Sequence, residues 1–209
     1  MNKGCFIVFE GPDGSGKSTV SQAVYEKLKA RDWPVVLTRE PGGSRIAEDI
    51  RDIILDTHNT EMDARTEALL YAASRRQHLI EKVLPAVEQG KIVICDRFVD
   101  SSLAYQAYGR QLGLEAVLSI NEFAIEGYYP DLTIFLNVTA ETGLKRLANR
   151  KDLDRLDQES LEFHQLVFAG YQKILATAKH HYIIVDANQT IDQVVNSALT
   201  IIEDFVNER

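Results

Sequence analysis

The sequence predicts an α/β fold, a five-stranded parallel sheet with helices on both faces, in a single domain spanning residues 1–209. Two observations support this prediction. Five short runs rich in apolar and β-branched residues alternate with segments of helical periodicity, and a glycine-rich turn joins the first run to the first helix. A length of 209 residues suits one domain with a sizeable core.

The elements follow one another along the chain without repeats or linkers. The expected strands are 5–10, 34–38, 91–96, 131–138 and 181–187. After the glycine-rich turn, apolar residues recur at helical spacing at Val20, Ala23, Val24 and Leu28. Further helical patterns cover about 45–56, 64–88, 101–108, 114–126, 140–148, 158–179 and 190–206. The segment 149–159 is charged and poor in apolar residues, which is typical of a mobile lid between two helices.

The turn itself reads GPDGSGKS, from Gly11 to Ser18, and matches the pattern of a phosphate-binding loop. Its glycines let backbone N–H groups point at phosphate oxygens, and the following helix aims its N-terminus at the same anion. Lys17 is expected to reach the β- and γ-phosphates, and Ser18 to ligate Mg²⁺. The residues expected to bind the phosphate chain are Gly11, Pro12, Asp13, Gly14, Ser15, Gly16, Lys17, Ser18 and Thr19.

Polar residues follow the strands at the edge where ligands bind in such sheets. They are Glu10, then Arg39, Glu40 and Pro41, then Asp96 and Arg97. An ATP-hydrolysing motor would more typically end its third strand in Asp-Glu, whereas an arginine there suits a second phosphate. The strand ends therefore indicate transfer between two phosphorylated molecules. Carboxylates here (Glu10, Asp13, Asp96) are candidates for Mg²⁺ or its waters, and Glu10 or Asp13 could instead hold the acceptor near the donor.

Composition excludes some classes of partner and location. The chain carries 23 basic and 31 acidic residues, a net charge of −8, which argues against a nucleic-acid-binding surface. There is no apolar run of membrane-spanning length and no signal-peptide pattern, so we expect a cytoplasmic protein without a membrane partner. Cys5 and Cys95 lie at different levels of the predicted sheet, too far apart for a disulfide.

Four blocks of sequence carry a resemblance to a known family. DRFVDSSLAYQ (96–106) is similar to the signature of the thymidylate kinases, and TREPGG (38–43), LLYAASR (69–75) and YPDLTIFLNV (129–138) match neighbouring family blocks in order. The resemblance implies a P-loop NTPase fold of the nucleoside monophosphate kinase type. It also implies the reaction ATP + dTMP ⇌ ADP + dTDP with Mg²⁺, a step toward dTTP for DNA synthesis, in a homodimer.

The resemblance also implies roles for individual residues. Arg39 and Arg97 would grip the 5′-phosphate of dTMP, within an acceptor site that includes Glu40 and Pro41. Around the base and sugar it places Arg51, Tyr71, Arg75, Ser101, Gln106 and Tyr108. A surface ion pair is the alternative for Arg39 and Arg97. A core aromatic is the alternative for Tyr71, a helix cap for Ser101, and a solvated helix residue for Arg51.

Negative charge on the transferring phosphate is commonly stabilised by an arginine, and the phosphate loop of this chain contains none. Some thymidylate kinases carry it just after the loop aspartate, where this chain has Gly14. Arg150 and Arg155 of the lid are therefore expected to complete a catalytic set with Asp13, Lys17 and Arg97. The alternative is a solvated lid whose arginines only offset its aspartates.

Two further questions stay open at this level. The segment 64–88 is apolar on more than one face, which suits either a dimer interface or full burial in a monomer. Rival functions are another phosphate-loop kinase, a GTPase-type switch and a phosphate-loop scaffold. A kinase for nucleosides would leave the two strand-end arginines without a phosphate to bind. A GTPase-type switch would need an Asn-Lys-x-Asp motif, which this sequence lacks.

Overall fold

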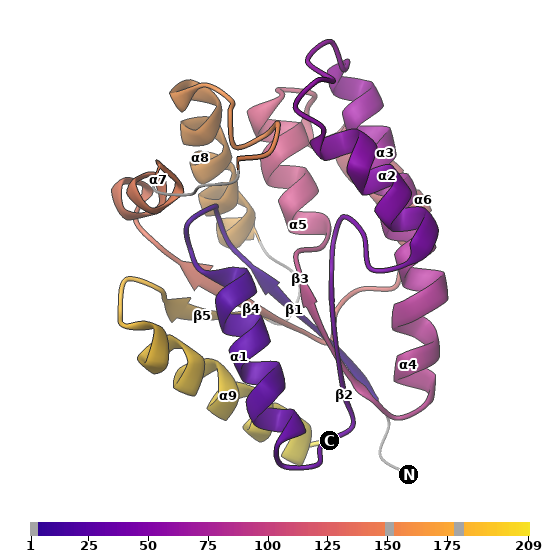
Figure 1. Cartoon of the computed structure of the whole chain (residues 1–209), viewed down its shortest axis with the longest axis vertical. Coiled ribbons are helices and arrows are strands. Elements are labelled where there is room, and N and C mark those ends of the chain that lie inside the picture. The colour runs from indigo at the N-terminus through magenta and orange to yellow at the C-terminus, as the bar shows by residue number, and fades with distance from the viewer. Residues whose placement is uncertain (1–3, 149–152, 178–181) are drawn as a thin grey trace.

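A computed structural model describes residues 4–148, 153–177 and 182–209 of the chain (Figure 1). Its centre is one five-stranded parallel sheet with the order β2-β3-β1-β4-β5. The strands are β1 (Cys5–Glu10), β2 (Val35–Arg39), β3 (Ile92–Asp96), β4 (Leu132–Asn137) and β5 (Tyr182–Asp186). All five predicted strands are confirmed, with ends that differ by one residue or are unchanged.

The register of the sheet aligns the polar residues that end three strands. Phe9 of β1 and Arg39 of β2 are both paired with Asp96 of β3, so these strands end at one level. The two cysteines are free and buried, with Cys95 opposite Val8 rather than Cys5. This confirms that they form no disulfide with each other.

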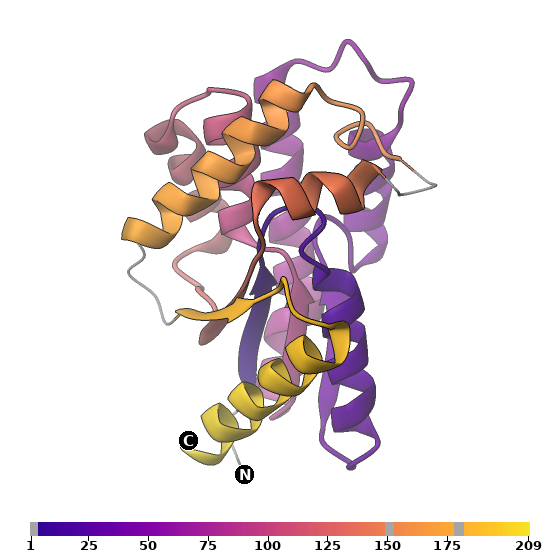
Figure 2. The same cartoon turned by 90° about the vertical axis from the view of Figure 1, so that its left-hand side faces the viewer.

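Helices cover both faces of the sheet, because the central strands are apolar on both sides and every residue of β1 and β3 is buried. One face packs against α1 (Lys17–Lys29) and α9 (Ile191–Asn207), which lie side by side (Figure 2). The opposite face packs against α6 (Leu114–Ile125), α8 (Leu161–Thr177) and the two composite helices described next.

Two predicted helices contain wider, π-helical turns. The segment expected at 64–88 is continuous but divides into α3 (Ala64–His78), η1 (Leu79–Val83) and α4 (Leu84–Glu88). Pro85 lacks the N–H group that a regular helix would use at this point, which accounts for the irregular turn before it. The segment expected at 101–108 begins earlier, as α5 (Val99–Ser102), and continues as η2 (Leu103–Gly109).

The remaining helices lie around the carboxyl edge of the sheet. They are α2 (Arg45–Leu55), which packs on α3, and α7 (Ala140–Ala148), which precedes the lid segment. Among the described residues, no helix combines the length and the apolarity needed to cross a membrane.

Candidate active site

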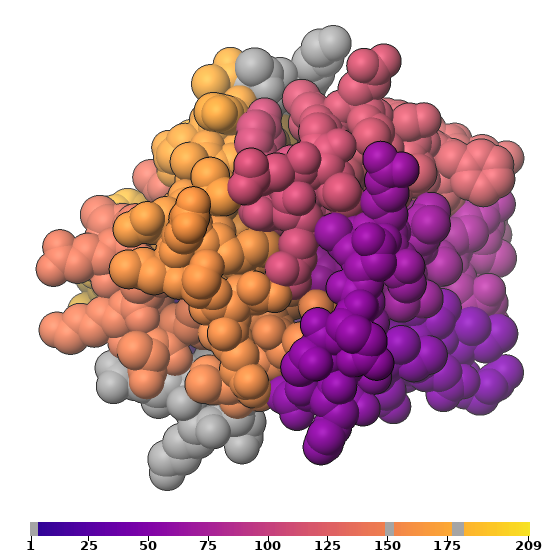
Figure 3. Space-filling view, turned by 90° about the horizontal axis from the view of Figure 1, so that it is seen from above, coloured from indigo at the N-terminus to yellow at the C-terminus, as the bar shows by residue number. Residues whose placement is uncertain are grey.

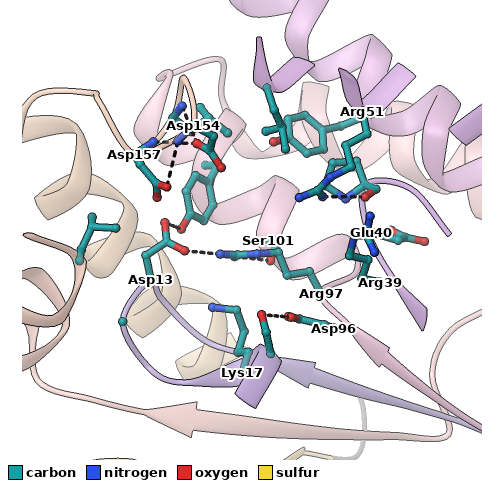
Figure 4. A pocket seen from close by; sticks show the side chains of 18 of the residues that line it. Asp13, Lys17, Arg39, Glu40, Arg51, Asp96, Arg97, Ser101, Asp154 and Asp157 are labelled. Carbon is teal, nitrogen blue, oxygen red and sulfur yellow. Dashed lines mark hydrogen bonds and ion pairs between the residues drawn. The ribbon is translucent and has the colours of Figure 1, made fainter. Parts of the chain in front are cut away.

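A pocket of about 390 Å³ opens at the carboxyl edge of β1, β2 and β3 (Figure 4). This volume lies within the range of roughly 300–1,000 Å³ that small-molecule sites occupy. Its lining residues come from the phosphate loop, two strand ends, five helices and the lid segment. They are Asp13, Gly14, Gly16, Lys17, Ser18, Thr19, Arg39, Glu40, Pro41, Arg51, Leu55, Tyr71, Asp96, Arg97, Ser101, Tyr105, Gln106, Arg146, Leu147, Asp154, Leu156 and Asp157.

The phosphate loop holds its lysine inside the pocket. Gly16, with a φ of 89°, turns the chain into α1, whose first residue is Lys17. Lys17 Nζ donates to the carbonyls of Gly11 (2.8 Å) and Pro12 (2.9 Å). Burial and the nearby Arg97 lower the pKa of Lys17 to about 8, although Asp13 opposes the shift. An anion bound in the pocket would therefore form an ion pair with the Lys17 ammonium group, whose buried charge is poorly compensated.

The phosphate loop packs closely against the backbone of α7 at Gly14. Gly14 has a φ of 76°, and a Cβ atom on it would collide with the backbone of Gly143 in α7. The helix thus closes the slot in which relatives can carry an arginine. Arg146 of α7 reaches the same place, because its guanidinium donates to the carbonyl of Gly14 at 3.1 Å. The sequence analysis missed Arg146, since it lies within an ordinary helical pattern.

A salt bridge spans the middle of the pocket between Asp13 and Arg97 (Figure 4). The Tyr105 hydroxyl donates to the second oxygen of Asp13, and the Arg97 guanidinium lies 5.2 Å from the Tyr105 ring centroid. Burial alone would raise the pKa of Asp13, but Arg97 and Lys17 outweigh it and hold the pKa well below its usual value. Arg97 has a φ of 73°, a strained conformation that aims its side chain into this bridge. The phosphate loop and the end of β3 are thereby joined.

The predicted metal ligands divide into two groups. Ser18 Oγ donates to Asp96 Oδ2 at 2.5 Å, and Asp96 Oδ1 is buried and has no hydrogen-bond partner among the described residues. A hydroxyl and a free carboxylate oxygen are the hard donors that Mg²⁺ prefers, so this pair fits the ion.

Glu10 does not fit that role. Its carboxylate accepts from the N–H of Phe98 (2.7 Å) and from Ser101 N–H (3.1 Å) and Oγ (2.8 Å). Burial raises its pKa despite these contacts and the nearby Arg97. We therefore revise the interpretation of Glu10: it anchors the first turn of α5, away from the pocket surface. Ser101 also lines the pocket and is held in place by this carboxylate.

Two more arginines stand at the opposite end from the phosphate loop (Figure 4). Arg39 pairs with Glu48 at 2.9 Å, and Arg51 donates to the carbonyl of Pro41 at 2.8 Å. Burial lowers the pKa of Arg51, and the positive charge of Arg39 lowers it further. Together with Arg97, these guanidiniums make this side of the pocket suited to an anion. The adjoining wall is less polar and includes Leu55, Tyr71, Gln106 and Leu156.

Arg75 lies behind this wall and not in the pocket. Its side chain is 2 % exposed and pairs with Glu40 (2.7 Å), the Ser102 hydroxyl (3.0 Å), the Phe98 carbonyl (2.9 Å) and Asn121. Glu40 also bonds to His78 at 2.8 Å. The donors of Arg75 are thus used to fix the wall, which differs from the base contact that the resemblance implied.

Three other residues expected in the site are not found in the pocket lining: two pack elsewhere, and one falls outside the described residues. Tyr108 packs against Gly170 of α8 and under Lys173. Arg155 turns away from the phosphate loop, and its guanidinium donates to the Ile54 carbonyl (2.8 Å) and to Glu67 (2.7 Å). On the face seen in Figure 3, the orange part of the chain meets its violet part. Arg150 falls outside the described residues.

Several pocket residues were not singled out from the sequence. Tyr105 lies inside the matched block 96–106, so its place in the block was an available signal. Asp154 and Asp157 are two of the lid aspartates, for which the sequence indicated no contact with a ligand, and both line the pocket. Leu55, the last residue of α2, and Leu156, in a turn of the lid segment, carried no signal, because single apolar residues at such positions are common in any fold.

The fold and the pocket define a phosphate-loop kinase of the nucleoside monophosphate kinase type, with a donor loop and an anion-binding acceptor side. A family model described as thymidylate kinase matches residues 9–198. The thymidylate kinase of Halalkalibacterium halodurans is 56% identical over 97% of this chain and 98% of its own, and that of Clostridium novyi is 54% identical over 93% and 96%. The crystal structure of thymidylate kinase from Ehrlichia chaffeensis superposes with a TM-score of 0.77 at 32% identity, covering 96% of this chain and 98% of that one. The chain belongs to the thymidylate kinase family.

Proposed function

We propose that this chain transfers the γ-phosphate of ATP to the 5′-phosphate of dTMP, giving dTDP and ADP in the synthesis of dTTP for DNA. One observation carries the proposal: a single pocket contains both the phosphate loop and a separate group of arginines at the strand ends. A kinase whose acceptor has no phosphate would leave those guanidiniums uncompensated. The membership of the family supports thymine as the base.

The donor half of the pocket binds and orients ATP. Backbone N–H groups of the loop and the N-terminus of α1 cradle the β- and γ-phosphates, and Lys17 neutralises charge that builds on the transferring group. Ser18 and Asp96 are the residues that would hold Mg²⁺, which would offset the negative charge of the phosphates. Arg146 stands at the mouth of the loop, where it can contact the donor.

The acceptor half binds dTMP by its two ends. Arg39 and Arg97 hold the 5′-phosphate with planar, bidentate donors, beside Arg51. The half-buried ring of Tyr71 offers a stacking face for the base, and Gln106 a polar contact at its edge. Arg97 pairs with Asp13, so a bound acceptor phosphate would compete with the Asp13 carboxylate for this guanidinium.

The lid segment supplies the catalytic arginine that the phosphate loop does not contain. Because the backbone of α7 closes the slot at Gly14, no side chain of the loop can stabilise the equatorial oxygens there. We assign that task to Arg150. Arg155, held by Glu67 and by the end of α2, anchors the lid and brings Leu156 against the pocket, where it helps to exclude water.

We also propose that the enzyme is a cytoplasmic homodimer. Large apolar side chains are exposed on α2, α3 with its extension, and α6: Ile46, Ile53, Leu69, Ile80, Leu114 and Phe123. Phe123 is 89% exposed and Leu69 56%, values that favour coverage by a second copy. Two free thiols support a reducing compartment.

The experiment is a coupled ADP-release assay with ATP and Mg²⁺, run across dTMP, dUMP, CMP and thymidine as acceptors. We expect the highest kcat/KM with dTMP and a loss of orders of magnitude with thymidine. ADP release that is independent of the acceptor would indicate an ATPase and refute the proposal, and comparable use of thymidine would refute the role of the strand-end arginines.

A further inference from the structure

Glu67 is a fully buried carboxylate that lies behind the base side of the pocket and does not line it. It stands in α3 four residues before Tyr71, on the same side of the helix. Its partners come from two other parts of the chain. Gln106 and Arg110 belong to η2 and its end, and Arg155 belongs to the lid segment.

The contact with Gln106 fixes the orientation of an amide. Gln106 Nε2 donates to Glu67 Oε1 at 3.0 Å. An ionised carboxylate only accepts hydrogen bonds, so the NH₂ group must face Glu67 and the carbonyl oxygen must face away. Within the part of the chain that the structure describes, that oxygen, Oε1, is buried and has no hydrogen-bond partner, and Gln106 lines the pocket. An unpaired buried acceptor is unfavourable, and a hydrogen-bond donor on a ligand beside Gln106 would satisfy it.

Glu67 keeps its negative charge in spite of its burial. Burial alone would raise its pKa, but the hydrogen bonds and charge of Arg110, with those of Gln106 and Arg155, lower the pKa below its usual value. Arg110 donates through NH2 at 2.9 Å and Arg155 at 2.7 Å. The Glu67 carboxylate therefore remains a hydrogen-bond acceptor at neutral pH. It keeps the NH₂ group of Gln106 directed toward Glu67.

We propose that Glu67 is a positioning residue for base selection, which acts by holding the Gln106 amide so that only its carbonyl oxygen faces the base. This inference rests on the proposed function. Thymine and uracil carry an N–H group at N3 that can donate to this oxygen, whereas cytosine carries an acceptor at N3. A cytosine base would place two acceptors against each other in a buried site, so Glu67 excludes cytosine without touching the substrate.

The test compares Glu67→Gln with a matched control, Glu159→Gln. Glu159 pairs with Arg110 at 2.5 Å, so the control weakens the same charge network while the bond from Gln106 to Glu67 remains. In Glu67→Gln the new amide can donate or accept, and the Gln106 amide is free to rotate. We expect the ratio of kcat/KM for dTMP to that for dCMP to fall about tenfold, chiefly through a higher KM for dTMP, and the control to keep the wild-type ratio.

A double-mutant cycle shows whether Glu67 acts through Gln106. In a Gln106→Met background, Glu67→Gln should change the ratio less than about twofold, because the amide it orients is gone. An equal change in both backgrounds, or an unchanged ratio in a folded Glu67→Gln variant, would overturn the proposal. Should Glu67→Gln fail to fold, Glu67→Asp keeps the charge but withdraws the oxygens, and it must still lower the ratio.

A measurement without turnover separates this inference from the proposed function. The side-chain ¹⁵N–¹H₂ signals of Gln106, assigned by their loss in Gln106→Met, should lie apart from those of solvent-exposed glutamines in the ligand-free wild type. In Glu67→Gln the Gln106 signals should move toward the chemical shifts of the solvent-exposed glutamines. Signals at the exposed position in the wild type would refute the Glu67 contact, whereas a wild type that shows this contact but does not phosphorylate dTMP would refute only the function.

Discussion

Replacing Lys17 by methionine should abolish phosphoryl transfer and at the same time stabilise the ligand-free protein. Lys17 is 5% exposed, and its pKa is lowered to about 8 from an ordinary value of 10.5. The folded chain therefore binds its ammonium proton less tightly than the unfolded chain does. Methionine keeps much of the length of the side chain and removes the buried charge.

The magnitude follows from the two pKa values. A difference of about 2.5 units, at about 1.36 kcal/mol each, makes the charged lysine cost about 3 kcal/mol of unfolding free energy at pH 7. The variant also loses two hydrogen bonds to Gly11 and Pro12, worth about 1 kcal/mol each. The net gain of about 1 kcal/mol corresponds to about 2–4 °C in Tm.

The sign of the pH dependence gives a second check. Between pH 8 and 10.5 the unfolded wild type binds more protons than the folded wild type, so its stability rises with pH through this window. The free energy of unfolding of Lys17→Met relative to the wild type should therefore fall by about 2 kcal/mol between pH 7 and pH 9.5, from a gain of about 1 kcal/mol to a loss of about 1 kcal/mol.

The assay is thermal and urea unfolding at both pH values, with and without ATP and Mg²⁺, alongside the turnover assay. ATP should raise the Tm of the wild type far more than that of the variant. Lys27→Met, an exposed substitution in the same helix, is the control and should change neither the pH profile nor the response to ATP. The reasoning fails if Lys17→Met is less stable at pH 7, shows the same pH dependence as the wild type, or keeps its turnover.

The remaining predictions concern the acceptor, the lid and the assembly. Arg97→Ala should lower kcat/KM for dTMP by orders of magnitude while thymidine use changes little, which steady-state kinetics with both acceptors will show. Arg150→Ala should lower kcat at least about a hundredfold with a much smaller change in the KM for dTMP, and wild-type turnover at saturating substrates would exclude it as the catalytic arginine. Phe123→Glu should shift the sedimentation coefficient from dimer to monomer, and a wild type that sediments as a monomer contradicts the proposed interface.

The sequence by itself determined the fold class, the phosphate loop and the family. These features are local: strand periodicity, the spacing from Gly11 to Ser18 and the block 96–106 are set by adjacent residues, so they can be read without knowing which distant segments meet. The strand ends Arg39 and Arg97 were also predictable, because parallel strands present their carboxyl ends at one edge.

Only the tertiary structure decided which polar groups are still free to meet a ligand. Glu10 could serve as a metal ligand and Arg75 as a base contact, and both lie in the expected motifs. Each instead forms its hydrogen bonds with residues behind the pocket, because an uncompensated charge that is buried so deeply is unfavourable. Of the residues that the structure describes, Asp96 and Gln106 line the pocket and each have one buried oxygen without a hydrogen-bond partner, which favours a contact with a ligand. Arg155 was expected at the donor and instead meets Glu67, 88 residues earlier in the chain. No local pattern encodes that contact, since it depends on the lid, α2 and α3 packing together.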